Sequence, residues 1–149
     1  MEWIKKLHGS TVGLDTAPLI YFIERHPTYL RLVYPFFESV ERGEIQIVTS
    51  MLTLTEVLVH PFKHGDQGLA DLYSDMLLNT GHLIALPVSA KIAEEAARIR
   101  AAYGVKTPNS IQLATARIGN ATAFLTNDRG FAPIPGLEVI VLEQVLAGP

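Results

Sequence analysis

Four short segments of the sequence carry a polar residue of a type that binds divalent cations. They read GLDTAPLIY, TLTEVLV, KTPNSIQLATA and FLTNDRGF, and they contain Asp15, Glu56, Asn109 and Asp128 in that order. Each segment runs from an apolar stretch into a turn or a helix start. Carboxylate and amide oxygens are ligands that hard cations such as Mg²⁺ accept. The pattern therefore predicts a divalent-metal site made of three carboxylates and one amide.

Each of these residues also has an ordinary structural explanation. Asp15 is a suitable helix N-cap, and Glu56 follows Thr53 at the spacing of a capping box. Asp128 lies in NDRG, a good turn sequence, and Asn109 fits the first turn of a helix as a plain polar residue. Only the order and the local context of the four residues together favour a common site over four separate caps and turns.

Several other chemistries find no support in the sequence. The chain has no cysteine, which excludes disulfides, thiolate zinc sites and a cysteine nucleophile. It has neither a glycine-rich phosphate loop nor a GxSxG motif. His60 and His64 have the spacing of neighbours on one helix face, but Pro61 is expected to end that helix, and the five histidines form no zinc signature.

The elements that must position the four residues follow from the hydrophobic patterning. Short apolar runs predict strands at residues 11–14, 45–48, 82–86, 122–125 and 138–142. Helical periodicity and capping residues predict helices at residues 16–24, 28–41, 53–60, 69–78, 91–103 and 109–118. Strands that alternate with helices form a mostly parallel sheet covered on both faces. We therefore expect one α/β domain over residues 1–149.

Such a sheet explains how distant residues can meet. Ligands of open α/β sheets bind beyond the carboxyl ends of the strands, at a topological switch point. Asp15 directly follows the first strand, and Asp128 follows the fourth by three residues. Glu56 and Asn109 are expected in first turns of helices. All four residues can therefore converge at one edge of the sheet.

Composition places the chain among ordinary globular proteins. Of its 149 residues 48% are hydrophobic and 18% are charged, and no apolar run approaches the roughly 20 residues that span a bilayer. The start of the chain, MEWIKKLHGS, lacks the apolar region of a secretion signal. We therefore expect a cytoplasmic protein without membrane segments. The net charge of −3 does not predict a nucleic-acid binder, although metal held by clustered carboxylates attracts phosphate.

With these motifs in order, the chain resembles the PIN-domain family, and within it the VapC-type toxin ribonucleases of toxin–antitoxin systems. The resemblance runs from about Val12 to Leu142 and rests on LDTAPLIYFIE, TLTEVL, KTPNSIQLATA and LTND. It implies a three-layer α/β/α sandwich around a parallel sheet of about five strands. It also implies acidic metal positions at Asp15, Glu56 and Asp128, with Thr126 as a hydroxyl position beside the last acid.

The resemblance further implies a function and partners. The expected activity is an Mg²⁺- or Mn²⁺-dependent endoribonuclease that leaves a 5′-phosphate and a 3′-hydroxyl on its RNA substrate. A cognate antitoxin protein is the expected partner, and a homodimer is the expected assembly.

Asn109 departs from the pattern, because the family usually has Asp at this position. Its carbonyl oxygen can still bind a hard cation, but it brings no negative charge. The chain is thus either a nuclease weakened at one ligand or a catalytically silent PIN-fold module that binds RNA or protein. An unrelated nucleotide-binding α/β domain is a third alternative.

Overall fold

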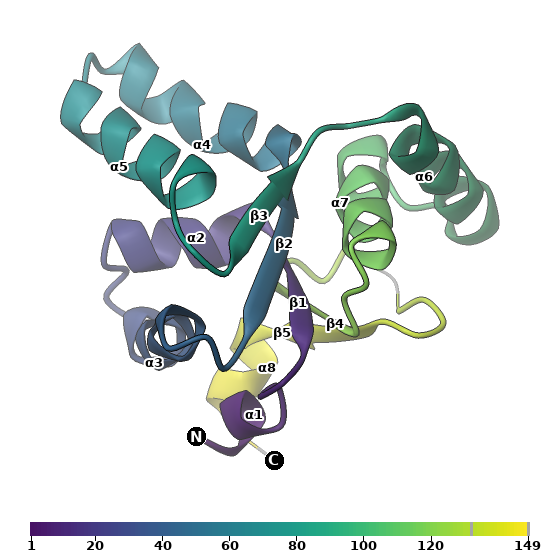
Figure 1. Ribbon diagram of the computed structural model, residues 1–149, viewed down its shortest axis with the longest axis horizontal. Coiled ribbons are helices and arrows are strands. Elements are labelled where there is room, and N and C mark those ends of the chain that lie inside the picture. The colour runs from purple at the N-terminus through teal and green to yellow at the C-terminus, as the bar shows by residue number, and fades with distance from the viewer. Residues whose placement is uncertain (132, 149) are drawn as a thin grey trace.

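A parallel five-stranded sheet forms the centre of the protein in a computed structural model that describes residues 1–131 and 133–148 (Figure 1). The strands are β1 (Thr11–Leu14), β2 (Gln46–Ser50), β3 (Leu83–Leu86), β4 (Ala123–Thr126) and β5 (Glu138–Val141). They lie in the order β3-β2-β1-β4-β5, and every neighbouring pair is parallel. The predicted sheet is confirmed, with strand ends shifted by one or two residues.

Helices cover both faces of this sheet. They are α1 (Glu2–Lys5), α2 (Thr16–Ile23), α3 (Leu30–Glu41), α4 (Met51–Lys63), α5 (Gln67–Leu78), α6 (Ala90–Tyr103), α7 (Thr107–Ile118) and α8 (Leu142–Ala147). One hydrophobic cluster packs α1 to α5 and α8 against the sheet, and a second packs α6 and α7 against the opposite face. Figure 1 shows the two groups on either side of the strands. The three-layer α/β/α sandwich is therefore confirmed.

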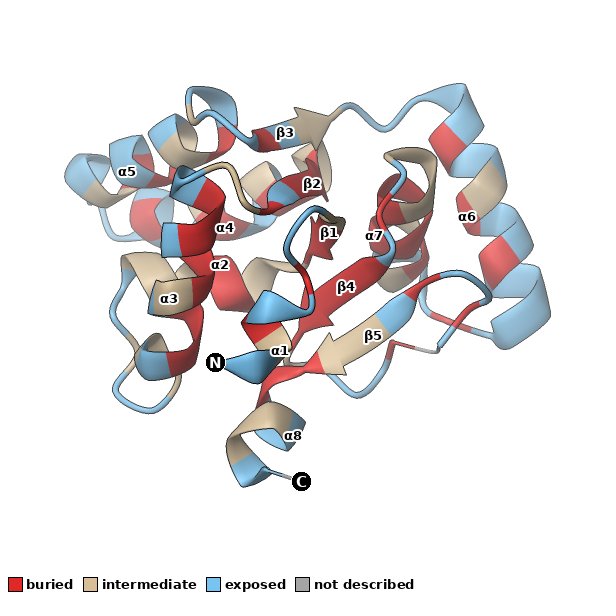
Figure 2. Ribbon diagram, turned by 60° about the horizontal axis from the view of Figure 1, so that its bottom comes forward, coloured by how far each residue is buried: buried red, intermediate tan, exposed pale blue. Residues whose placement is uncertain are grey.

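The side of the sheet on which new strands are added changes at β1, while all strands stay parallel. From β1 the chain builds β2 and β3 on one side and then crosses to place β4 and β5 on the other. The carboxyl ends of β1 and β4 are thus adjacent, and the Asp15 backbone N–H donates to the Leu125 carbonyl at 3.0 Å. Figure 2 shows that β1 and β4 are the buried centre of the sheet. This is the switch point where an α/β sheet offers a ligand site.

Gly13 in β1 allows α7 to pack directly on the sheet. A Cβ atom at this position would lie 2.5 Å from Ala116 Cβ and 2.8 Å from Phe124 Cδ1. We expect Gly13→Ala to reduce the free energy of unfolding by about 1–3 kcal/mol, because overpacking forces the helix away from the strand. Urea denaturation measures the loss. Gly68→Ala is the control, since its Cβ would meet only Asp66 Oδ1 at 3.7 Å; an equal loss in both variants would contradict the packing argument.

The prediction that Pro61 ends its helix is wrong. Helix α4 begins after the N-cap Ser50, whose hydroxyl accepts from Leu52 N, and runs through Pro61 to Lys63. Pro61 stands near the end of the helix and is buried, so one lost hydrogen bond is offset by packing of its ring. Because the helix continues, the rings of His60 and His64 lie side by side, with centroids 4.3 Å apart and planes tilted by 41°.

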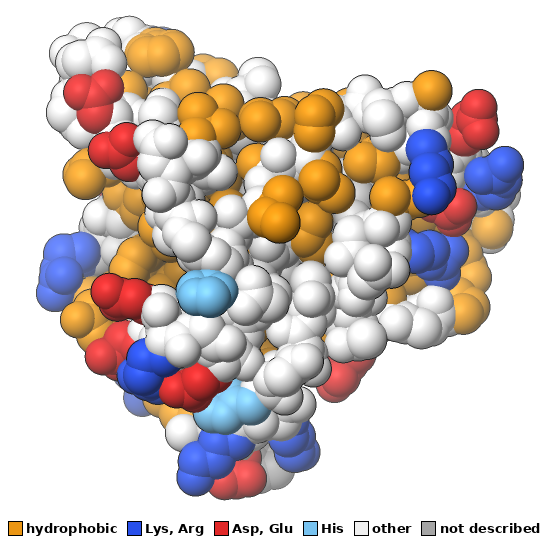
Figure 3. Space-filling model, viewed as in Figure 1, with side chains coloured by type: hydrophobic (Ala, Val, Ile, Leu, Met, Phe, Trp, Pro, Cys, Tyr) orange, Lys and Arg blue, Asp and Glu red, His pale blue; other side chains and the backbone are white. Residues whose placement is uncertain are grey.

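The exposed surface includes one concentration of apolar side chains beside an edge strand. Figure 3 shows hydrophobic side chains gathered over β3 and the segment that follows it. Ile84 is 62% exposed and Val88 is 45% exposed. None of the helices in the described ranges is both long and apolar enough to cross a membrane.

Candidate functional site

Asp15 stands at the junction of β1 and α2 and performs two tasks. It is the N-cap of α2, and its Oδ1 accepts a hydrogen bond from the Thr16 backbone N–H at 2.7 Å. Its other oxygen, Oδ2, accepts from the Thr126 hydroxyl at 2.7 Å. The capping role predicted for Asp15 is therefore real, and it fixes the carboxylate at the switch point of the sheet.

Thr126 connects Asp15 to the loop after β4. Its side chain is fully buried, and its Oγ1 accepts from the Asp128 backbone N–H at 2.9 Å while donating to Asp15. Asp128 in turn accepts from Gly130 N through Oδ1 at 2.7 Å, which is the turn geometry expected of NDRG. One hydroxyl thus holds the loop that carries Asp128 beside Asp15.

Glu56 is linked to the same region by a different threonine. The Thr16 hydroxyl donates to Glu56 Oε1 at 3.0 Å, across 40 residues of sequence. The capping-box explanation of Glu56 is wrong, because α4 starts at Met51 and Ser50 is its cap. Glu56 lies in the second turn of the helix, and its carboxylate reaches α2 instead of its own backbone.

Asn109 lies in the first turn of α7 and faces the loop that carries Asp128. A Cβ atom built on Gly130 would lie 3.1 Å from Asp128 Oδ1 and 3.4 Å from Asn109 Nδ2. The carboxylate of Asp128 and the amide of Asn109 therefore both lie beside Gly130. The structure thus brings Asp15, Glu56, Asp128 and Asn109 to one edge of the sheet, as the sequence predicts.

The charges of this region repel one another. Burial raises the pKa of the Asp15 carboxyl above its ordinary value, and the hydrogen bonds from Thr126 and from Thr16 N oppose this rise. The negative charges of Glu56 and Asp128 raise the pKa of Asp15 further. A bound cation would offset both the cost of burying ionised Asp15 and the repulsion among the acids, because it favours the ionised form of all three carboxyls.

The donor set suits a hard divalent cation, but its side chains are not gathered around one point. Within residues 1–131 and 133–148, no group of three or more His, Asp or Glu side chains is close enough to hold a metal ion. Asp15 is held through both oxygens, whereas Glu56 and Asp128 are exposed and each is held through one oxygen, by the Thr16 hydroxyl and by Gly130 N. Binding of one cation by all three carboxylates would therefore require these side chains to move.

Other acidic residues near the site in sequence do not replace the missing carboxylate. Glu24 accepts a hydrogen bond from the Tyr73 hydroxyl, and burial together with this contact raises the pKa of Tyr73. Glu95 pairs with Arg117 at 3.1 Å, and Glu94 is an exposed residue of α6. Glu24 and Glu95 therefore make contacts within the fold, and Glu94 faces solvent.

Sequence reasoning missed one buried polar residue of this region. Gln112 is 3% exposed, and its Nε2 donates to Thr53 Oγ1 at 2.8 Å and lies 3.5 Å from Glu56 Oε1. The available signal is its position one helical turn after Asn109, which places both residues on one face of α7.

Comparison with known proteins identifies the class that this fold and site define. The PIN domain family matches residues 12–137, so the chain belongs to the PIN domain family. The predicted resemblance is thereby confirmed. No curated protein sequence matches the chain.

Three solved structures show the same fold. VapBC2 from Rickettsia felis, bound to a promoter DNA fragment, has a TM-score of 0.67 at 21% identity, covering 88% of this chain and 98% of the other. A toxin–antitoxin complex from Klebsiella pneumoniae has a TM-score of 0.63 at 27% identity, covering 89% and 98%. DNA-bound VapBC from Salmonella typhimurium has a TM-score of 0.66 at 21% identity, covering 89% and 98%.

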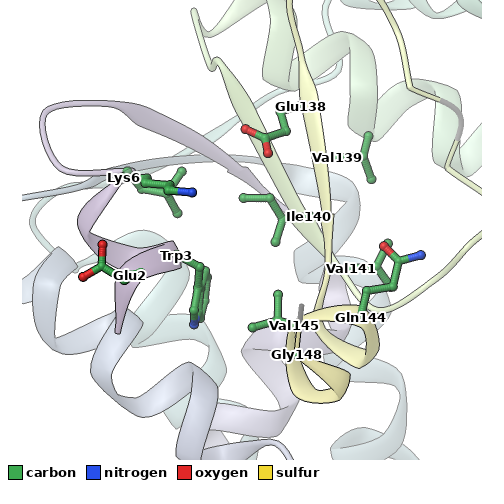
Figure 4. A pocket seen from close by; sticks show the side chains of 11 residues that line it. Glu2, Trp3, Lys6, Glu138, Val139, Ile140, Val141, Gln144, Val145 and Gly148 are labelled. Atoms are coloured by element: carbon green, nitrogen blue, oxygen red, sulfur yellow. The ribbon is translucent and has the colours of Figure 1, made fainter.

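A separate cavity lies outside the part of the chain that matches the family. It has a volume of about 620 Å³ and is formed by α1, β5 and α8. Figure 4 shows Trp3, Ile140 and Val145 among the side chains that line it. None of the candidate metal-site residues contributes to this cavity, so it belongs to another part of the surface.

Proposed function

We propose that this PIN-domain protein is a VapC-like, divalent-metal-dependent endoribonuclease. It would hydrolyse RNA phosphodiester bonds to leave a 5′-phosphate and a 3′-hydroxyl. The observation that carries the proposal is the linkage of three acids at the switch point of the sheet. Thr16 and Thr126 connect Asp15 to Glu56 and to the loop of Asp128. Three distant segments are thereby joined around carboxylates that repel one another.

The residues divide the work according to their contacts. Bound Mg²⁺ or Mn²⁺ would polarise the phosphate and lower the pKa of a water. Asp15 and Asp128 are the proposed primary ligands, and Asn109 is a neutral ligand through its carbonyl oxygen. Oε1 of Glu56 accepts the hydrogen bond from the Thr16 hydroxyl, which leaves Oε2 to bind the metal or to hold the attacking water. Thr126 keeps the Asp15 carboxylate oriented, and the reaction needs no side-chain nucleophile.

A second candidate function is a catalytically silent module that binds RNA or protein. Asn109 favours it, because the neutral amide lowers the charge available to a metal. The separation of the acidic groups in the described structure points the same way. This alternative retains the fold and the partner surfaces but lacks the cleavage step.

The products of RNA cleavage test the leading proposal. Purified wild-type protein with Mg²⁺ or Mn²⁺ is expected to cleave single-stranded RNA and to leave 5′-phosphate and 3′-hydroxyl ends, which end-labelling identifies. EDTA should stop the reaction, and Mg²⁺ in excess should restore it. Cleavage that resists EDTA, or 2′,3′-cyclic phosphate products, would contradict a metal-dependent mechanism of this kind.

We also propose an antitoxin protein as the partner of this chain. The structural neighbours are complexes of that type, and the chain has a suitable apolar groove. A cavity of about 400 Å³ lies among α2, α3 and α5. Its apolar lining residues are Phe22, Ile23, Tyr34, Leu72 and Met76, and Arg25, Asp75 and Thr80 complete the lining. Phe22 and Ile23 stand at the C-terminal end of α2, whose N-cap is Asp15, so this groove and the acidic site lie at opposite ends of one helix.

A homodimer and a cytoplasmic location complete the proposal. The apolar surface at Ile84 and Val88 borders the edge strand β3, and a second copy of the chain would remove it from water.

A further inference from the structure

Three buried polar side chains form a hydrogen-bonded relay beside the acidic site and join three elements of the fold. Thr49 on β2, Thr53 on α4 and Gln112 on α7 are 1%, 0% and 3% exposed. The Thr49 hydroxyl donates to the Leu14 carbonyl at 2.8 Å, and Leu14 directly precedes Asp15. Thr49 and Thr53 are joined at 3.0 Å, and Gln112 Nε2 donates to Thr53 at 2.8 Å.

The proton count fixes the direction of every bond in this relay. Thr49 has a single hydroxyl proton, which it donates to the Leu14 carbonyl. Thr53 must therefore donate its own proton to Thr49 and accept from the next group. That group must be a donor, so the amide NH₂ of Gln112 faces Thr53 and the carbonyl oxygen faces away.

The same orientation explains an unusual orphan atom. Gln112 Oε1 is buried and has no hydrogen-bond partner among the described residues. Turning the amide over would bring this oxygen toward Thr53, which has no proton left for it, and toward the Glu56 carboxylate. An unpaired carbonyl costs about 1–3 kcal/mol, but two facing acceptors cost more. The relay therefore holds the amide in a position that Gln112 alone would not favour.

The second proton of the amide lies toward Glu56. Gln112 Nε2 is 3.5 Å from Glu56 Oε1, a long contact, and the Thr16 hydroxyl donates to that same oxygen at 3.0 Å. Both donors act on Oε1, and no side chain in the described part of the chain donates to Oε2. The two donors thus hold one oxygen of Glu56 and leave the other for the site.

We propose that Gln112 is a positioning residue for Glu56, with its amide oriented by the Thr49–Thr53 relay. The proposal rests on the nuclease function proposed above and adds a residue to it. Gln112 touches neither substrate nor metal. It sets which carboxylate oxygen of Glu56 is available, and it ties that choice to the backbone beside Asp15.

Gln112→Met is the variant that separates positioning from stability. Methionine fills a similar volume and removes both the orphan oxygen and the two donors. We expect the denaturation midpoint to stay unchanged or rise, whereas kcat for RNA cleavage falls roughly tenfold or more with KM within about twofold. The kinetics are measured in the wild-type chain and in the Asn109→Asp background. An unchanged kcat in both would overturn the proposal.

Thr115→Val is the matched control. Thr115 is a buried residue of the same helix, and its hydroxyl donates to the Ile111 carbonyl of α7 itself. This variant also exchanges a polar side chain for an apolar one, but it leaves the relay intact. It should retain wild-type kcat. A loss of kcat equal to that of Gln112→Met would show that any buried change in α7 disturbs the site, and the specific role would fall.

Gln112→Glu provides the opposite substitution. A carboxylate cannot donate to Thr53, and it would face Glu56 with a second negative charge. We expect a lower denaturation midpoint than that of Gln112→Met, together with the loss of cleavage. Stability equal to wild type would contradict the direction assigned to the relay.

A measurement without metal or RNA keeps this inference separate from the proposed function. The single variants Gln112→Met and Glu56→Ala and their combination are unfolded with urea in EDTA. We expect their effects on the unfolding equilibrium constant to differ from additivity by roughly threefold or more. Additive effects would overturn the contact between the two side chains. If neither wild type nor Asn109→Asp cleaves RNA, the nuclease proposal fails while this double-mutant cycle still decides on Gln112.

Discussion

Asn109→Asp is expected to raise metal-dependent RNA cleavage by about tenfold or more, which corresponds to roughly 1.4 kcal/mol of transition-state stabilisation. Two unit charges about 4 Å apart interact by roughly 4 kcal/mol at an effective dielectric constant of 20. Desolvation of the new carboxylate offsets much of this gain, but a fraction suffices for the expected change. Cleavage rates at saturating Mg²⁺, with growth arrest on expression, provide the measurement.

The same substitution is expected to lower the folding stability of the metal-free protein. Asn109 Nδ2 and Asp128 Oδ1 both lie beside Gly130, so a carboxylate at position 109 would stand near that of Asp128. Aspartate would therefore introduce repulsion between like charges, adding to the repulsion that already raises the pKa of Asp15. Thermal denaturation in EDTA should therefore show a lower midpoint, and Mg²⁺ should reverse the loss.

Asn120→Asp is the charge-matched control for this experiment. Asn120 is exposed and follows the far end of α7, roughly 16 Å along the helix from Asn109 at 1.5 Å per residue. It adds the same charge without reaching the site and should change neither cleavage nor the response to Mg²⁺. If Asn109→Asp binds metal normally and still cleaves nothing, the chain is better described as a binding module.

The sheet could be predicted from the sequence because its evidence is local. Each strand is a short apolar run between helical segments, and the alternation implies parallel pairing. Convergence of Asp15 with the loop of Asp128 follows from that topology, since both come after strands that end at one edge. Family motifs then place Glu56 and Asn109 at the same edge.

The contacts that hold the site could not be predicted, because they join segments far apart in the sequence. Thr16 reaches Glu56 across 40 residues, and Gln112 reaches Thr53 across 59. Locally, Thr53 and Glu56 have the spacing of a capping box, and this pattern predicted the wrong helix start. Tertiary contacts of both side chains, together with the Ser50 cap, override the local pattern.

Asp15→Asn is expected to abolish cleavage and at the same time to stabilise the metal-free protein. Loss of the central carboxylate should reduce the rate by roughly 100-fold or more, since second-shell changes alone cost about 10- to 100-fold. Asparagine keeps an oxygen for the Thr16 backbone N–H and removes the charge that burial, Glu56 and Asp128 oppose. We expect the free energy of unfolding in EDTA at pH 7 to rise by roughly 0.5–2 kcal/mol.

The pH dependence of this gain follows from the direction of the pKa shift. The folded protein raises the pKa of Asp15, so it binds that proton more tightly than the unfolded chain does. The unfavourable contribution of ionised Asp15 is therefore complete above the folded pKa. It disappears as the pH falls through the folded pKa toward the unfolded value. The stability difference between Asp15→Asn and wild type should shrink over the same range.

Asp66→Asn is the matched control, because Asp66 also caps a helix but is exposed. Its Oδ1 accepts from Leu69 N at 3.0 Å, and asparagine caps nearly as well as aspartate, so stability should change little. Mg²⁺ sharpens the comparison: at 100 times its Kd a ligand of the folded state stabilises by about 2.7 kcal/mol. Wild type should gain stability from Mg²⁺ and Asp15→Asn should not. If Asp15→Asn instead loses stability in EDTA, the carboxylate acts as a structural cap. The charge repulsion at Asp15 would then be no mark of a metal site.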